Sequence, residues 1–258
     1  MKTMSKYWTK RDIKQRQKLL SKTINETDKE LALQYRKVAE RLKIKLQNTY
    51  REILESKKDE TILVSDLYRY NKYYETLADI NNELNKLNES SVKILGKQLP
   101  LMYRENTKLL NKQMGLYSKA DKYAVNVAVN SIWCADGKNW STRIWTNKAL
   151  LANKLETTLV DAVASGVSID TLTKNIMADF GVSFSNAQRL VRTELAHVQN
   201  VSTADRYKDA GVSKYTIIAE DDACDECLEL AEQEFDINNI VIPAHPNCRC
   251  CMIPVVED

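Results

Sequence analysis

The chain has 258 residues, of which 43% are hydrophobic and 28% are charged, and its formal net charge is only +3. This length suffices for one large domain or two ordinary ones. No run of about 18 apolar residues is present, and the first residues lack the apolar stretch of a signal peptide, so we exclude a membrane span and expect a soluble protein in a reducing, intracellular setting.

The small net charge conceals two halves of opposite sign. Residues 1–130 hold 27 Lys and Arg against 16 Asp and Glu, a net of +11, whereas residues 131–258 hold 11 against 19, a net of −8. Such asymmetry predicts that the halves face different partners. The basic half suits nucleic acid or an acidic protein surface, and it equally suits a solvated helical surface.

The first half of the sequence is typical of long helices, because no glycine precedes Gly96 and no proline precedes Pro100. Apolar side chains recur there at three- and four-residue steps, as Leu31, Tyr35, Val38, Leu42, Leu46, Tyr50 and Ile53, and as Leu67, Tyr70, Tyr74, Leu77, Ile80, Leu84 and Leu87. We predict a turn at Lys57–Glu60 and a second helix start at Ser65-Asp66. Residues 1–125 then form an extended helical hairpin or small bundle.

The texture changes after residue 126, where Trp133, Trp140 and Trp145 fall close together and are expected to anchor a core or a contact between domains. Three helices are predicted next, over 147–165, 169–180 and 185–210. Ser168 and Ser185 are the expected N-caps, and Gly166, Gly181 and Gly211 the expected ends.

The last of these helices carries Arg189, Arg192, Thr193 and Glu194. The two arginines share a helix face, so they can hold a carboxylate or pair with the acidic segment that follows. A catalytic role for Glu194 finds no nucleophile or second acid beside it in the sequence, and an internal network of ion pairs is the favoured interpretation.

After Gly211 the pattern favours strands, at 214–219 and at 252–256, where Pro254 indicates a sheet edge. Between them, residues 220–236 hold nine acidic side chains and no basic one, which suits a solvated loop and a short helix. This stretch lacks the ligand spacing and the central glycine of a calcium-binding EF-hand loop.

Five of the six cysteines lie in the last 35 residues, as Cys224-x-x-Cys227 and, after 17 intervening residues, in the run from His245 to Cys251. Two tight turns of this kind can supply the four thiolate and imidazole ligands of a structural zinc site. We predict Cys224, Cys227 and His245 as ligands, with Cys248 or Cys250 as the fourth. A disulfide framework or free thiols are the alternatives.

These elements predict a mostly α fold with a small α+β part at its C-terminal end. Residues 1–125 form the basic long-helix region, and residues 126–258 form a helical domain that ends in a zinc-stapled β hairpin. The sequence offers no small-molecule site and no membrane-binding segment.

The second half resembles a known family. Its motifs run in the order Trp140-Ser-Thr-Arg143-Ile-Trp145, Gly166-Val-Ser168, Leu190-Val-Arg192-Thr193-Glu194, Cys224-x-x-Cys227 and His245-Pro-Asn-Cys248-Arg-Cys250. This order is similar to that of the phage Mu F-like minor head proteins, also called head morphogenesis proteins, over residues 130–258.

The resemblance implies a structural component of a tailed-phage head and not an enzyme. Members of this family enter the head in few copies, associate with the portal or scaffold and in some phages leave with the DNA. The implied partners are portal, capsid and scaffold proteins, with packaged DNA as a candidate for the basic half. The implied location is the virion, inside the capsid or at the portal vertex, after assembly in the host cytoplasm.

The competing interpretations are a zinc-dependent HNH-like nuclease and a nucleic-acid-binding zinc module. The chain has only two histidines, so a nuclease that uses His245 as a ligand has only His197 as an imidazole base. A zinc deaminase would need an H-x-E element together with P-C-x-x-C, and neither occurs.

Overall fold

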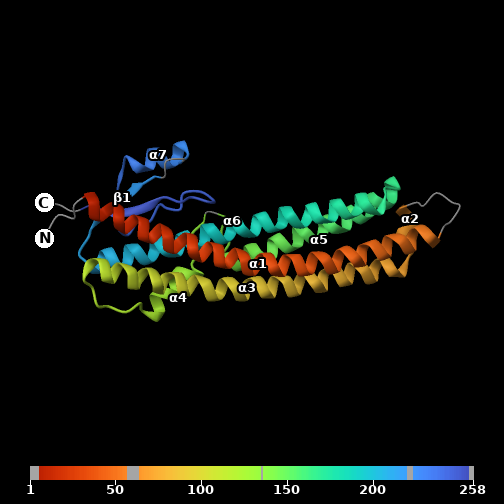
Figure 1. The fold of residues 1–258 in the computed structure, drawn as a ribbon, viewed down its shortest axis with the longest axis horizontal. Helices are drawn as coiled ribbons and strands as arrows, with labels where there is room; N and C mark the ends of the chain where they lie inside the picture. The colour runs from red at the N-terminus through yellow and green to blue at the C-terminus, as the bar shows by residue number, and fades with distance from the viewer. Residues whose placement is uncertain (1–5, 57–63, 135, 220–222, 256–258) are drawn as a thin grey trace. The chain divides into compact units, whose positions relative to one another are not determined.

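Long helices make up most of the molecule (Figure 1). The computed structural model describes residues 6–56, 64–134, 136–219 and 223–255. The helices are α1 (Lys6–Ser56), α2 (Val64–Leu67), α3 (Asn71–Met114), α4 (Lys122–Asn130), α5 (Trp140–Ser165), α6 (Ile169–Asp209) and α7 (Asp225–Ala231). The predicted mostly α fold with a small C-terminal sheet is therefore confirmed. Among the described helices, none is long and apolar enough to cross a membrane.

The chain divides into two compact units that are each built from separate stretches of sequence. Unit 1 comprises Met1–Asp28, Leu95–Trp140 and Arg189–Asp258, and unit 2 comprises Lys29–Ile94 and Ser141–Gln188. The helices α1, α3 and α6 each contribute to both units. The sequence boundary between residues 125 and 126 rests on charge and family resemblance, and it stays a prediction.

Unit 2 contains the predicted helical hairpin. Thr49 on α1 and Thr76 on α3 share a hydrogen bond of 2.7 Å between their hydroxyls, and Arg41 pairs with Glu83 at 2.6 Å. The partner of Thr49 on α3 is Thr76, and the partner of Arg41, one stretch earlier on α1, is the later residue Glu83. The two helices are therefore antiparallel. The turn predicted at Lys57–Glu60 lies outside the described residues, and the long second helix begins at Asn71 after the short α2, later than the predicted start at Ser65-Asp66.

The apolar stripes predicted for these helices form the core of unit 2. All seven positions from Leu31 to Ile53 are buried, as are Ile80, Leu84 and Leu87. Tyr74 breaks the prediction, because it is 53% exposed and its neighbour Tyr73 is buried instead. The phenol of Tyr73 donates to Glu156 of α5 at 2.9 Å, which ties the hairpin to the next helix of the unit.

The second half of the helical part differs from the prediction at two places. The helix predicted over 147–165 begins earlier, at Trp140, and the helix that follows it does not end at Gly181. Ser168 caps α6 as expected, since its hydroxyl accepts from the Thr171 amide at 3.1 Å. The helix then continues through Gly181 to Asp209, so the predicted end at Gly181 and start at Ser185 are wrong. The Ser185 hydroxyl donates to the Gly181 carbonyl at 3.0 Å, a bond made within a continuing helix and not at a cap.

Unit 1 ends in a three-stranded antiparallel sheet of order β2-β1-β3, formed by β2 (Glu234–Asp236), β1 (Lys214–Ile218) and β3 (Cys251–Pro254). Both predicted strands are present, and Pro254 lies on an edge strand as expected. The strand β2, within the acidic stretch, was not predicted. Arg16 on α1 donates to the Met252 carbonyl at 2.7 Å, so β3 lies beside the first turns of α1 (Figure 1).

Candidate metal centre

The first pair of predicted ligands lies at the start of α7. Cys224 is the N-cap residue, with an extended backbone (φ −75°, ψ 165°), and its carbonyl accepts from the Leu228 amide at 3.0 Å. Cys227 follows in the first turn, three residues later, and residues at this spacing share one side of a helix. The helix start therefore presents both sulfurs in the same direction, with Cys227 buried and Cys224 exposed.

The second group of ligands comes from a tight turn. The Cys248 amide donates to the His245 carbonyl at 3.1 Å, and Asn247 has a positive φ of 66°. A type II turn needs a positive φ at its third residue and favours proline at its second. Asn247 and Pro246 occupy these two positions. The His-Pro-Asn-Cys sequence therefore encodes a turn with His245 at its first position and Cys248 at its last.

The predicted ligands come together in space. The Nε2 atom of His245 lies 3.2 Å from the Cys224 sulfur and 3.1 Å from the Cys227 sulfur, and the Cys227 and Cys248 sulfurs are 3.7 Å apart. The donors form two overlapping groups, one of Cys224, Cys227 and His245 and one of Cys227, Cys248 and Cys250, each with all ligand atoms within 4.8 Å of one another. Both groups share Cys227.

These donors suit a metal ion that prefers sulfur and nitrogen. Two thiolates on one tetrahedral zinc lie roughly 3.8 Å apart, given zinc–sulfur bonds of about 2.3 Å. The Nδ1 atom of His245 lies 2.9 Å from the Pro246 carbonyl, which can only accept, so Nδ1 carries the proton. The lone pair is then on Nε2, between the two sulfurs, as in histidine ligands fixed by a backbone carbonyl. The cluster can hold a metal ion.

The thiols at the centre of the cluster influence one another's ionisation. The hydrogen bond from Cys250 lowers the pKa of the Cys248 thiol to about 5, and the same hydrogen bond raises the pKa of Cys250. Burial raises the pKa of Cys227 to about 12. Cys227 therefore keeps its proton unless a cation offsets the negative charge, and a bound divalent metal supplies that charge.

The remaining cysteines take no part in these groups. Cys251 is buried at the start of β3, where its sulfur lies 3.8 Å from the Arg249 carbonyl. Cys134, the one cysteine distant in sequence, is partly buried. None of the described cysteines forms a disulfide.

The Arg-Thr-Glu segment of α6 contacts the turn between His245 and Cys248. The hydroxyl of Thr193 accepts a hydrogen bond of 3.2 Å from the Asn247 amide and donates to the Arg189 carbonyl at 2.7 Å. Thr193 therefore fixes the turn between His245 and Cys248 against the helix. Arg192 pairs with Asp28 at 3.6 Å, on α1 and not in the acidic segment downstream.

Glu194 and His197 form a second cluster with Trp133. The indole of Trp133 donates to Glu194 at 3.1 Å, and its ring stacks on the His197 imidazole, with centroids 4.2 Å apart and an interplanar angle of 7°. His197 is 6% exposed, and burial lowers its pKa to about 4. Sequence reasoning named these residues separately; the three-residue spacing of Glu194 and His197 on one helix face was the only signal that they act together.

The tryptophans differ in role. Trp133 covers His197, and Trp140 is buried with its indole donating to the Val129 carbonyl at 3.0 Å, so both anchor unit 1 as expected. Trp145 is 41% exposed, with Lys148 lying over its ring at 5.9 Å. It belongs to unit 2, and its exposure excludes it from the anchoring role.

Comparison with known families gives a match between residues 153–253 and the family described as Phage Mu protein F like protein. The matched region contains α6 with its Arg-Thr-Glu segment, all five candidate ligands and the sheet except for its last residue, Pro254. No curated protein and no solved structure matches the chain. The match supports a structural role in phage head morphogenesis, in the virion and in contact with other virion proteins. Residues 153–253 of this chain are therefore similar to the phage Mu F-like family.

Proposed function

We propose that this chain is a minor head protein of a tailed phage, built into the capsid near the portal during head assembly. The family match over residues 153–253 carries the proposal. The fold is consistent with this, because the matched segment contains a turn with two candidate metal ligands, and Thr193 of the Arg-Thr-Glu segment accepts a hydrogen bond from that turn. We further propose residues 126–258 as the head morphogenesis domain and residues 1–125 as a helical extension with its own partner.

Quantitative mass spectrometry of purified heads tests this proposal. The chain should be present in full heads at a few copies for each portal ring, and cross-linking should join it to portal, capsid or scaffold proteins. Emptied heads measured in parallel test ejection, since a protein that leaves with the DNA is depleted from them. Absence of the chain from heads and from assembly intermediates would remove the proposal.

The cysteine cluster is proposed to hold one structural zinc ion, bound by Cys224, Cys227, His245 and Cys248. Cys248 is preferred over Cys250 as the fourth ligand because its sulfur lies 3.7 Å from that of Cys227, close to the spacing on zinc. Cys250 then donates a hydrogen bond to the Cys248 sulfur. Zinc bound here would cross-link the start of α7 to the turn before β3 and so stabilise the sheet.

Metal analysis of ligand variants tests this assignment. Protein purified without chelator should contain about one zinc per chain. Cys227→Ser should abolish binding, whereas Cys251→Ser, a buried cysteine outside both donor groups, should retain it. Cys248→Ser should weaken binding more than Cys250→Ser does. The reverse order would make Cys250 the ligand, and metal-free wild-type protein with all its thiols reactive would exclude the site.

The proposed role is structural and not catalytic. The single histidine outside the cluster, His197, is stacked against Trp133 and 6% exposed, a poor position from which to activate water on a phosphate. Pure protein should leave supercoiled and single-stranded DNA intact with magnesium, manganese or zinc. Cleavage that is lost in His197→Ala would assign the protein to the nucleases instead.

Packaged DNA is the proposed partner of the basic helices. Arg11, Lys14, Lys18 and Lys22 follow one another on α1 at three- and four-residue steps and are all exposed. Binding by such a stripe should be independent of sequence and should weaken steeply with salt. Lys14→Glu/Lys18→Glu should weaken duplex binding at low salt by at least about tenfold. If the double variant binds duplex DNA as the wild type does, this stripe of α1 is not a DNA-binding surface.

A further inference from the structure

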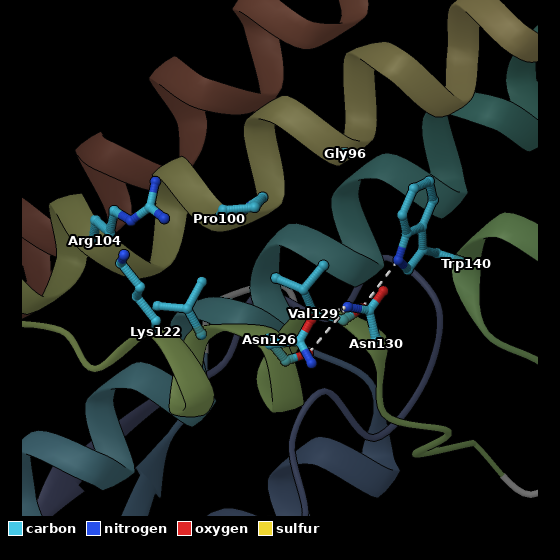
Figure 2. Close-up of a pocket in the computed structure, with 9 residues that line it drawn as sticks. Gly96, Pro100, Arg104, Lys122, Asn126, Val129, Asn130 and Trp140 are labelled. Carbon is cyan, nitrogen blue, oxygen red and sulfur yellow. Dashed lines mark hydrogen bonds between the residues drawn. The ribbon is translucent and has the colours of Figure 1, made fainter.

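A pocket in unit 1 combines apolar walls with two cations. It has a volume of about 370 Å³ and lies between α3, α4 and Trp140 (Figure 2). Its apolar wall is formed by Pro100, Val125, Val129 and Trp140. Arg104 and Lys122 approach each other at the end of the pocket opposite Trp140. The site therefore offers an apolar surface next to a concentrated positive charge.

The two cations of the pocket are available to a ligand. Both side chains are exposed, and neither forms an ion pair or hydrogen bond within the described part of the chain. Two adjacent cations repel each other unless an anion lies between them. The pocket therefore fits a segment that brings carboxylates together with a protruding apolar side chain.

The same chain displays such a segment on α7. Asp225, Leu228 and Glu229 of α7 and its C-cap residue Glu232 follow at steps of three, one and three residues, which places them on one face. All four are exposed, and Leu228, at 49% exposure, is the large apolar side chain among them. The opposite face of α7 is held by buried Cys227 and by Leu230, which packs on the core of unit 1. The acidic face therefore lies on the solvent side of α7.

We propose that copies of this chain associate head to tail, with the acidic face of α7 from one copy docked in the pocket of the next. Leu228 contacts the apolar wall formed by Val125, Val129 and Trp140, and Glu229 and Glu232 pair with Arg104 and Lys122. The two surfaces are opposite in charge, and each has an apolar component. A second copy therefore fits the pocket better than nucleic acid does, because the apolar wall would have no partner on a phosphate backbone.

The symmetry and size of the proposed contact determine which assemblies it can build and how strong they are. Each copy carries one pocket and one acidic face, so the contact is heterologous and builds rings or open chains. A seven-residue helix buries a small area, so association is weak and depends on concentration. Salt weakens it, since the paired charges are near the surface.

Sedimentation velocity of the full-length chain over a range of concentrations tests the proposal. Wild-type protein should associate as concentration rises. Arg104→Glu/Lys122→Glu and, separately, Glu229→Lys/Glu232→Lys should each weaken self-association by at least about tenfold. An equimolar mixture of the two variants should associate again, because opposite charges are restored across one contact. Lys154→Glu/Lys174→Glu, with the same change in net charge at two exposed lysines of unit 2, should associate as the wild type does.

Three results would overturn the proposal. Wild-type protein that stays monomeric at every concentration excludes the contact. Association that survives both charge reversals places the contact on another surface. Failure of the mixture to associate shows that the two surfaces are not partners. If the wild type is monomeric while a short single-stranded DNA binds and Arg104→Glu/Lys122→Glu abolishes that binding, the pocket belongs to nucleic acid instead.

Discussion

At the scale of single residues, Thr193 connects the helical part of unit 1 to the metal centre. Its hydroxyl is the acceptor for the Asn247 amide, in the middle of the turn that carries His245 and Cys248. The Arg-Thr-Glu segment and the His-Pro-Asn-Cys motif are therefore parts of one arrangement, although more than 50 residues separate them in sequence.

Removal of that hydroxyl should destabilise the turn. Thr193→Val keeps the shape of the side chain but leaves the Asn247 amide without its acceptor, at a cost of about 1–3 kcal/mol in the free energy of unfolding. Thr193→Ser keeps the hydroxyl and should lose less. Urea unfolding of the two variants measures the difference, and an equal loss in both would show that packing of the methyl group, and not the hydrogen bond, fixes the turn.

His197 should make the stability of the protein depend on pH. Burial lowers its pKa from 6.5 to about 4, so between these values the unfolded chain binds a proton that the folded chain does not. The contribution of neutral His197 to the free energy of unfolding is therefore at its full value above about pH 6.5. It falls by about 1 kcal/mol for each pH unit as the pH drops toward 4.

The matched variant is His197→Phe, which keeps a flat ring against Trp133 but has no proton to bind. Its free energy of unfolding should fall less than that of the wild type between pH 6.5 and 4, and other titrating groups cancel in the comparison. Parallel pH profiles for the two proteins would contradict the burial of a neutral imidazole.

At the scale of elements, α6 shows where sequence patterns reach their limit. An isolated glycine can end a helix in the left-handed conformation or lie within it at a small cost, and the sequence around Gly181 does not distinguish the two. Gly166 does end its helix, with φ of 59°, whereas Gly181 does not have a positive φ and lies inside α6.

Alanine substitutions at Gly181 and Gly166 distinguish a glycine within a helix from a glycine that ends one. Gly181→Ala adds a methyl group that meets no atom within 4 Å, and it should stabilise the protein by about 0.5–1 kcal/mol through the helix propensity of alanine. Gly166→Ala should destabilise it by about 1 kcal/mol, because alanine is strained at positive φ. Thermal unfolding reports both. Destabilisation by Gly181→Ala would instead indicate that a helix ends at Gly181, as the sequence pattern predicted.

The elements that were predicted correctly are those with long repeating patterns. The stripe from Leu31 to Ile53 could be assigned from periodicity because seven positions agree. The short, local spacing of the cysteine and histidine motifs predicted that their side chains would lie close together, and they do. The three-residue strand β2 has no such repeat. The contacts of Thr193 with Asn247 and of Trp133 with His197 join distant segments, and only the folded chain brings them together.

At the scale of the whole molecule, the two compact units do not follow the order of the sequence. The helices α1, α3 and α6 each pass from one unit to the other, so the charge boundary near residue 130 does not separate two independent cores. Substitutions in the intact chain therefore test partners better than isolated halves would. The candidate metal ligands, in contrast, all lie in the C-terminal segment of unit 1.

The proposed zinc ion acts as a structural staple in an otherwise helical protein. Hydrogen exchange of the intact chain, before and after removal of the metal with a chelator, tests this role most directly. We predict loss of protection in β1, α7 and β3, with α5 and the part of α6 in unit 2 protected as before, because a structural metal contributes its binding energy to the fold around it. Equal loss along the entire chain, or no change in the C-terminal segment, would contradict the account.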